Sequence, residues 1–65
     1  MQVTFKLNSR TRKIQVEEKT IEELLKKFKI NTESVLVKKN GRFVPVEDKM
    51  KNGDILEIIE ITSSG

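Results

Sequence analysis

Hydrophobic and polar residues alternate at the start of the chain. The apolar positions of Val3–Leu7 are separated by polar residues, and Ile14 and Val16 repeat this pattern after the polar segment Asn8-Ser9-Arg10. A period of two residues is typical of a strand with one buried face. Asparagine and serine favour turns because their short side chains bond to the nearby backbone. The pattern therefore predicts an opening β-hairpin.

The next segment changes to the period of a helix. Ile21, Leu24, Leu25 and Phe28 follow the spacing i, i+3, i+4 and i+7, which places them on one helical face. Thr20 and Glu23 have the spacing of a capping box, in which each side chain accepts from the other residue's backbone N–H. We therefore predict a helix that opens at Thr20 and runs to Phe28.

Two shorter strands and one longer strand are predicted in the rest of the chain. A polar loop or single turn, Asn31–Ser34, precedes the Val35–Val37 strand. Asn40-Gly41 predicts a tight hairpin to Arg42–Val44, because both turn residues tolerate positive φ. The final strand, Ile55–Ile61, is apolar at nearly every position.

The order strand–strand–helix–strand–strand–strand predicts an α+β fold with a mixed sheet and one helix across one face. A last strand that is apolar on both faces is expected at the centre of the sheet, beside and parallel to the first strand. This arrangement is the β-grasp (ubiquitin-like) fold. A plain α+β sheet with another strand order is the alternative.

Composition excludes several kinds of chemistry. The 65 residues include no cysteine and no histidine, so the chain lacks a thiol nucleophile, the usual general base near neutral pH and the commonest zinc ligands. Adjacent acidic pairs point to different sides of their elements, and Ser63 and Ser64 have no histidine to activate them. We therefore expect no catalytic residue, no metal site and no cofactor bound by this chain.

Charge and length limit the partners in a similar way. The net charge of +3 is modest and interleaved along the chain, which does not favour nucleic-acid binding. No segment reaches the length of a membrane span, and the amino terminus does not resemble a signal peptide. We expect a cytoplasmic protein that is monomeric when alone.

The carboxyl terminus is the strongest candidate for a functional group. We divide the chain into a folded domain, residues 1–61, and a flexible tail, residues 62–65, which ends in Ser63-Ser64-Gly65. Glycine carries no Cβ and adopts a wide range of backbone angles. Such a tail can enter the narrow active site of another protein and present the Gly65 carboxylate there.

Four segments occur in a characteristic order before this glycine. They are the helix opening at residues 20–28, residues 30–35, residues 37–41 with Val44-Pro45 after them, and residues 51–54 before the last strand. In this order and spacing, the chain resembles the ThiS/MoaD family of ubiquitin-like sulfur carrier proteins over essentially its whole length. The short length and the Asn40–Pro45 segment make it more similar to ThiS than to MoaD.

The resemblance implies a carrier that is not itself an enzyme. A partner adenylating enzyme of the ubiquitin-activating type (ThiF/MoeB-like) would use ATP and Mg²⁺ to adenylate Gly65, and a sulfur donor would then form a thiocarboxylate. The implied acceptor is a thiazole synthase of thiamine biosynthesis. Less favoured uses are molybdopterin synthesis through the synthase large subunit, tRNA thiolation and protein modification. The nucleotide belongs to the partner, because this chain has no glycine-rich phosphate loop.

The end of the chain departs from the family pattern. The family ends in Gly-Gly, whereas this chain ends in Ser64-Gly65. Serine adds a side chain and loses glycine's easy access to positive φ. Three explanations remain open: a further glycine follows Gly65, the partner tolerates serine, or the tail chemistry has been lost. We favour the first.

A docking surface is predicted beside the tail. If Leu56 and Ile58 face the helix, alternation turns the other apolar residues of the last strand outward. Exposed apolar patches with a charged rim are typical of docking sites. The predicted partner-docking residues are Leu36, Phe43, Ile59 and Ile61. The competing interpretation is half-buried packing at a sheet edge.

A second hypothesis is a non-catalytic, TGS-like β-grasp module that binds RNA or protein through a basic surface. Basic residues flank both predicted hairpins: Lys38, Lys39 and Arg42 around one, and Lys6, Arg10, Arg12 and Lys13 around the other. We favour a solvated face balanced by glutamates over a binding patch. A third hypothesis is a structural partner subunit without tail chemistry.

Overall fold

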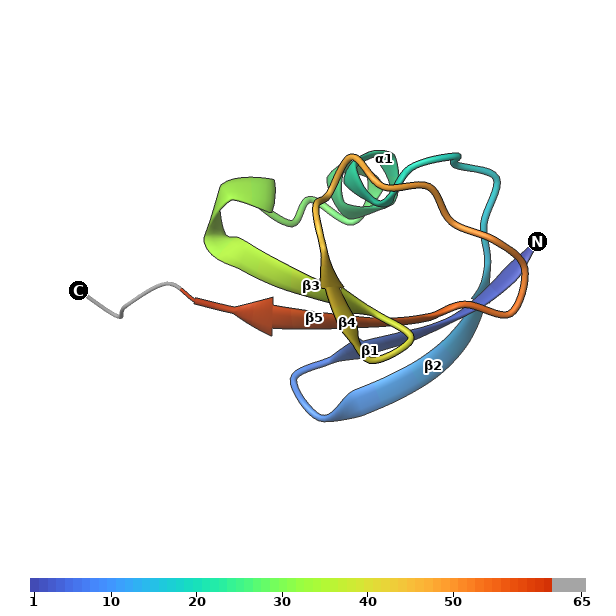
Figure 1. Cartoon of the computed structure of the whole chain (residues 1–65), viewed down its shortest axis with the longest axis horizontal. Helices are drawn as coiled ribbons and strands as arrows, with labels where there is room; N and C mark the ends of the chain where they lie inside the picture. Colours follow the sequence, from blue (N-terminus) through green and yellow to red (C-terminus); the bar gives the residue numbers. More distant parts are fainter. Residues whose placement is uncertain (62–65) are drawn as a thin grey trace.

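A five-stranded sheet carries one helix across one of its faces (Figure 1). The computed structural model describes residues 1–61, so the predicted tail with Ser63, Ser64 and Gly65 lies outside the described residues. The elements in chain order are β1 (Gln2–Leu7), β2 (Arg10–Gln15), α1 (Ile21–Lys27), the 3₁₀ turn η1 (Thr32–Ser34), β3 (Val35–Lys39), β4 (Arg42–Val44) and β5 (Ile55–Glu60).

The last strand lies at the centre of the sheet, as predicted. The strand order is β2-β1-β5-β3-β4, and β5 runs parallel to β1 and antiparallel to β3. Leu56 lies opposite Phe5 of β1, and Ile58 lies opposite Val37 of β3. Alternation turns Leu56 and Ile58 into the core, where both are buried. The central position explains these two residues, whereas Ile55 on the other face is 43% exposed.

The helix begins where the capping box was predicted. The Glu23 backbone N–H donates to Thr20 Oγ1 (3.3 Å), and the Thr20 N–H donates to Glu23 Oε1 (3.2 Å). Such a cap stabilises a helix by about 1 kcal/mol. Three helical side chains are fully buried against the sheet: Ile21, Leu24 and Leu25.

The carboxyl end of the helix differs from the prediction. The last helical residue is Lys27, and Phe28 is a C-cap residue with 43% of its surface exposed, not a fourth member of the buried face. Lys29 adopts φ +61°, its N–H donates to Lys26 O (3.0 Å), and the Ile30 N–H donates to Leu25 O (2.9 Å). These bonds form a Schellman motif, which turns the chain back toward the sheet.

Both hairpins close through two-residue turns. Asn8 and Ser9 have φ of 51° and 67°, and Asn40 and Gly41 have φ of 54° and 86°. Positive φ at both positions is the type I′ geometry that matches the twist of the flanking strands. The first turn places the start of β2 at Arg10, which is earlier than the alternation of Ile14 and Val16 indicated.

A long loop closes the core on the side of the helix start. The Ile21 N–H donates to Asp48 O (3.0 Å), and the Glu22 N–H donates to Val46 O (2.7 Å). The loop also contributes a buried methionine. The buried apolar side chains are Val3, Phe5, Val16, Ile21, Leu24, Leu25, Val35, Val37, Met50, Leu56 and Ile58.

Candidate functional site

The candidate site lies at the carboxyl end of β5. This strand points toward the end of the molecule opposite Met1 (Figure 1). The Ile61 N–H donates to Ser34 O (2.9 Å), which continues the pairing of β3 and β5 one residue beyond the strand. Gly65 follows Ile61 by four residues. The fold therefore fixes the position from which the last four residues begin.

Apolar side chains gather on the sheet face turned away from α1, here called the outer face. Leu36 lies directly opposite Ile59 in the β3–β5 ladder. Leu36 is 44% exposed, Ile61 is 51% exposed and Ile59 is half-buried. Because Leu56 and Ile58 face the core, strand alternation places Ile59 and Ile61 on the outer face. Three of the four predicted docking residues thus lie on one face, and one of them, Ile61, is the last described residue.

Phe43 lies at the margin of this group. It is 62% exposed and lies opposite Lys38, whose Nζ is 4.9 Å from the centre of its ring. This is the geometry of a cation–π contact. A hollow of about 360 Å³ adjoins Phe43 where β4 ends, lined by Val35, Leu36, Val37, Phe43, Val44, Pro45 and Val46. Leu36, Phe43, Ile59 and Ile61 together are called the outer-face patch.

A row of charged residues bounds the outer-face patch. Glu57 lies opposite Lys6 of β1 and Lys38 of β3, so the three charges cross the outer face side by side. Beyond this row lies Ile55, which is 43% exposed and was not among the predicted site residues. The alternation that selected Ile59 and Ile61 also applies to Ile55, so the sequence contained its signal.

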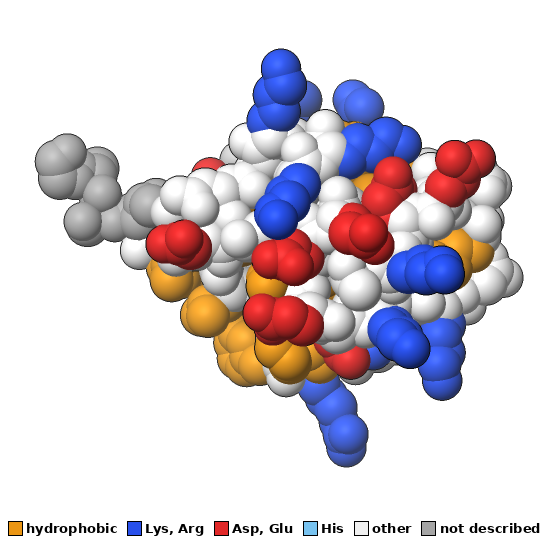
Figure 2. Space-filling view, turned by 90° about the horizontal axis from the view of Figure 1, so that it is seen from above, with side chains coloured by type: hydrophobic (Ala, Val, Ile, Leu, Met, Phe, Trp, Pro, Cys, Tyr) orange, Lys and Arg blue, Asp and Glu red, His pale blue; other side chains and the backbone are white. Residues whose placement is uncertain are grey.

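The basic clusters are divided between faces. In the first hairpin, alternation places Lys6 and Lys13 on the outer face and Arg10 and Arg12 on the side of α1. Lys39 is held by an ion pair with Asp48 (2.7 Å). Figure 2 looks onto the side that carries α1, where acidic and basic side chains are interspersed and hydrophobic side chains gather along one edge. The charges on this side do not form one basic surface.

Among residues 1–61, two carboxyl groups have perturbed pKa values, and both make contacts within the fold. Backbone N–H groups of Thr20 and Lys19 donate to Glu23 and lower the pKa of its carboxyl. A hydrogen bond from Lys39 lowers the pKa of Asp48. Neither residue lies on the outer face near Ile61.

Within residues 1–61, no group of three or more His, Cys, Asp and Glu side chains is placed to hold a metal ion. No helix of that part is long and apolar enough to cross a membrane.

In residues 1–61, the mixed sheet with strand order β2-β1-β5-β3-β4, covered by α1, defines a β-grasp domain of the ubiquitin-like class. A family model described as the ThiS family matches residues 5–65, and the chain belongs to this family. It is also similar to the crystal structure of the thiamine biosynthesis protein (ThiS) from Geobacter metallireducens, with a TM-score of 0.70 and 25% identity over 100% of both chains. The predicted fold class and the resemblance to ThiS are thus confirmed.

Proposed function

We propose that this protein is a sulfur carrier of thiamine biosynthesis and that the Gly65 carboxylate is the group that carries the sulfur. The observation that carries the proposal is the ThiS family match over residues 5–65, which includes Gly65. The complete mutual coverage with the thiamine biosynthesis protein of Geobacter metallireducens supports the same use. The chain is then a substrate of partner enzymes and has no catalytic residue of its own.

The chemistry needs an activated carboxyl group. In the first step, a carboxylate oxygen of Gly65 attacks the α-phosphorus of ATP, which releases pyrophosphate and forms an acyl-adenylate. In the second step, sulfide attacks the acyl carbon and AMP leaves, which forms a thiocarboxylate. A carboxylate alone is a poor electrophile, and AMP is the leaving group that makes the substitution feasible. The partner, an adenylating enzyme of the ubiquitin-activating type, supplies the ATP and Mg²⁺ site.

The outer-face patch is the proposed docking surface for this enzyme. It combines exposed apolar side chains with the charged row of Lys6, Glu57 and Lys38, and this combination is typical of an interface core with a polar rim. The patch includes Ile61, the last described residue, and this supports the assignment because a partner bound there holds the start of the tail. The acceptor that receives the sulfur is proposed to be a thiazole synthase.

The test is sulfur loading of the purified protein, measured by intact mass. The protein is incubated with a ThiF/MoeB-type adenylating enzyme of the same cells, ATP, Mg²⁺ and sulfide. We expect a mass increase that corresponds to exchange of one carboxylate oxygen for sulfur, located on the terminal peptide by fragmentation. The variant that lacks Gly65 should show no increase. The proposal would be overturned by an unchanged mass for the chain ending at Gly65, for the Ser64→Gly variant and for the chain extended by one glycine.

Three chain ends distinguish the explanations for Ser64. They are the chain ending at Ser64-Gly65, the Ser64→Gly variant, and the chain extended by one glycine. If the chain ending at Ser64-Gly65 is loaded, the partner tolerates serine. If only the extended chain is loaded, a further glycine is part of the substrate. If only the Ser64→Gly variant is loaded, a tail with Ser64 has lost its activity.

A further inference from the structure

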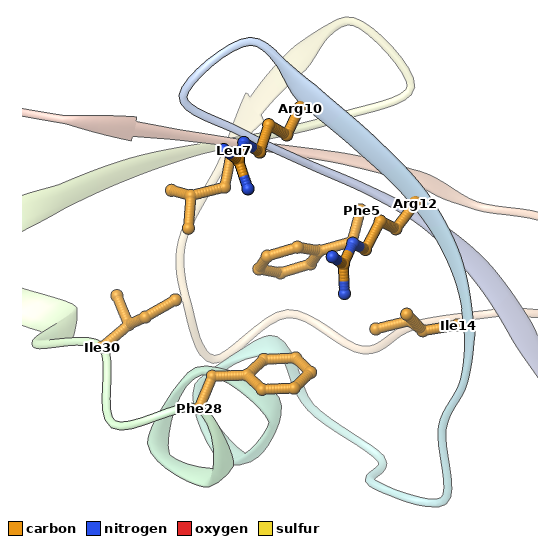
Figure 3. A pocket seen from close by; sticks show the side chains of 7 residues that line it. All are labelled: Phe5, Leu7, Arg10, Arg12, Ile14, Phe28 and Ile30. Carbon is orange, nitrogen blue, oxygen red and sulfur yellow. The ribbon is translucent and has the colours of Figure 1, made fainter.

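A second apolar surface lies on the helix side of the sheet, away from the outer-face patch. A groove of about 320 Å³ opens between the β1–β2 hairpin and the carboxyl end of α1 (Figure 3). Phe28 and Ile30 line one wall, and the hairpin lines the other. The groove-lining residues are Phe5, Leu7, Arg10, Arg12, Ile14, Phe28 and Ile30.

The groove exists because the helix is too short to cover the hairpin. α1 ends at Lys27, and the Schellman motif then turns Ile30 back toward the sheet. The Phe28 ring contacts Phe5, with 5.3 Å between ring centres and a 55° tilt, yet 43% of Phe28 remains exposed. An aromatic pair that is half-open to solvent leaves apolar area that a ligand can bury.

The strand above this groove has an unpaired edge. β2 is the first strand in the sheet order, and within residues 1–61 no strand pairs with its other side. The Val16 N–H donates to Met1 O (2.8 Å) and the Met1 amino group donates to Val16 O (3.2 Å), which marks this as a hydrogen-bonded pair. Along an antiparallel ladder, such hydrogen-bonded pairs alternate with pairs whose backbone N–H and C=O groups point away from the partner strand. The residues of β2 whose backbone groups point outward are therefore Thr11, Lys13 and Gln15.

The edge and the groove share a positive charge. β2 carries Arg10, Arg12 and Lys13 and has no acidic residue. Within residues 1–61, none of the three forms an ion pair. In Figure 3, Arg10 and Arg12 extend from β2 over the space that faces Phe28 and Ile30. Lysine and arginine on an edge strand also discourage self-association of sheets, so charge alone does not identify a binding site.

We propose that β2 and the groove bind an extended segment of another protein, with alternating apolar side chains and acidic flanks, as an added strand. The backbone of the segment pairs with Thr11, Lys13 and Gln15. Its apolar side chains on the helix side fill the groove against Phe28 and Ile30. Its acidic flanks meet Arg10 and Arg12. Main-chain pairing supplies affinity and the pockets under alternate side chains supply specificity, as in other cases of strand addition.

The charges argue for a partner over a second copy of this chain. Two β2 strands paired edge to edge would bring Arg10, Arg12 and Lys13 of one copy against the same residues of the other, and like charges across a ladder are destabilising. The site also lies on the opposite face from the outer-face patch. A carrier bound to its activating enzyme through that patch would keep β2 accessible, and the inference does not depend on chemistry at Gly65.

The test uses a synthetic acetylated and amidated peptide whose alternating Ile, Thr and Val centre is flanked by Asp and Glu. Binding is followed through amide resonances of the full chain, together with amide hydrogen exchange. We expect shifts at Phe28 and Ile30 and slower exchange at Thr11, Lys13 and Gln15, with little change at Arg12 and Ile14, whose N–H groups already bond to β1. A peptide of the same composition in scrambled order is the control for charge alone.

Two further comparisons separate strand addition from other binding. Two methylated peptides are compared, one with methyl groups on the odd-numbered amides and one with methyl groups on the even-numbered amides. Only one of these sets of N–H groups faces β2, so one peptide should bind about tenfold more weakly and the other should bind normally. The Arg10→Glu, Arg12→Glu double variant should also bind about tenfold more weakly. The control, Arg42→Glu, reverses a charge on β4 at the other edge of the sheet and should bind normally, since Arg42 is exposed and forms no ion pair within residues 1–61.

Three outcomes would overturn the proposal. Equal binding of both methylated peptides or of the scrambled peptide would show that no strand is added. Shifts centred on Leu36 and Ile59 would place the peptide on the outer-face patch. Concentration-dependent protection of Thr11 and Lys13 without peptide would show that a second copy of the chain occupies the edge.

Discussion

Leu36 of β3 lies directly opposite Ile59 of β5, and both side chains stand on the face of the sheet turned away from the helix. Paired strands place such opposing side chains about 5 Å apart, so the two form one apolar surface. Ile61 continues this surface at the last described residue. The pairing joins strands that are distant in sequence, and it brings them together where the tail begins.

Charge placed in this surface should weaken docking of the adenylating enzyme. We expect Leu36→Asp to raise the apparent KM of adenylation for the carrier about 10- to 100-fold, because a carboxylate would be desolvated in an apolar contact. Pyrophosphate release with increasing carrier concentration measures this effect. Leu36 is 44% exposed and pairs with Ile59, so the substitution should also cost about 1 kcal/mol of stability, and the thermal midpoint is measured beside the KM.

Ile55→Asp is the matched control for this prediction. Ile55 lies on the same strand and face, with a similar exposure of 43%, but beyond the charged row of Lys6 and Glu57. Its KM should remain within about twofold of the natural protein, since substitutions at the rim of an interface cost little. If Ile55→Asp and Leu36→Asp were equally harmful, docking would extend over the whole outer face.

A hydrogen-bonded clamp links the second hairpin to the start of β5. Asn40 Nδ2 donates to Asp54 Oδ1 (3.0 Å), and the Ile55 N–H donates to Asn40 Oδ1 (2.9 Å). The other carboxylate oxygen of Asp54 accepts from the Lys51 N–H (2.7 Å). Asp54 is buried, so its partners determine whether its charge is tolerated.

Asn40→Gly should destabilise the protein by about 1–2 kcal/mol. Glycine keeps the positive φ of the turn but removes two hydrogen bonds and leaves a buried carboxylate oxygen without its partner. For a domain of this size, each kcal/mol corresponds to roughly 4–8 °C in thermal midpoint, which calorimetry or circular dichroism measures. Asn8→Gly is the matched control.

Asn8 occupies the same turn position in the first hairpin, with φ 51°. Within residues 1–61, its side chain makes no hydrogen bond of this kind. We expect a change within about 0.5 kcal/mol for Asn8→Gly. Equal destabilisation of both variants would indicate that the loss comes from glycine's flexibility in the unfolded chain and not from the clamp.

The sequence predicted the fold well because its strongest signals are local or depend on burial. The Thr20–Glu23 capping box and the Asn40-Gly41 turn are determined by a few neighbouring residues. The apolar run of β5 predicted a central strand, and the strand order confirms this position. These features do not need knowledge of distant contacts.

The end of the helix, the extent of β2 and the pairing of the outward-facing residues depend on contacts that the hydrophobic periodicity of the sequence does not reveal. Phe28 fits the helical spacing, but the Schellman motif ends the helix before it and leaves the ring half-exposed. Apart from Ile14, the residues of β2 are polar on both faces, because the strand has only β1 as a partner and lies at an edge. Alternation identified Ile59 as outward-facing, but only the register shows that Leu36 is its neighbour.

Lys29→Gly should stabilise the protein. Lys29 has φ +61° at the position after the helix where glycine is preferred. A Cβ in the left-handed region costs about 1–2 kcal/mol, and glycine's larger entropy in the unfolded chain offsets roughly 0.5–1 kcal/mol of this gain. We expect a net stabilisation of about 0.5–1 kcal/mol, measured by chemical denaturation. Lys27→Gly, within the helix, should have the opposite sign, with a loss of about 1 kcal/mol.

Acid should weaken the start of the helix through Glu23. Hydrogen bonds from the Thr20 and Lys19 backbone lower the pKa of this carboxyl below its ordinary value of 4.5. A carboxyl whose pKa is lower in the folded state binds protons more readily when unfolded. Its contribution to stability is therefore fully present above pH 4.5 and is lost as the pH falls through the lower folded value.

Glu23→Gln separates this effect from the hydrogen bonds themselves. A glutamine oxygen can still accept from the Thr20 N–H, so the capping box is kept while the titrating group is removed. We expect the variant to be slightly less stable than the natural protein at neutral pH, with the two thermal midpoints converging as the pH falls below 4.5. Asp48, whose pKa is lowered by Lys39, titrates in both proteins and cancels in the comparison. Midpoints that remained parallel across this range would mean that the Glu23 charge does not stabilise the helix.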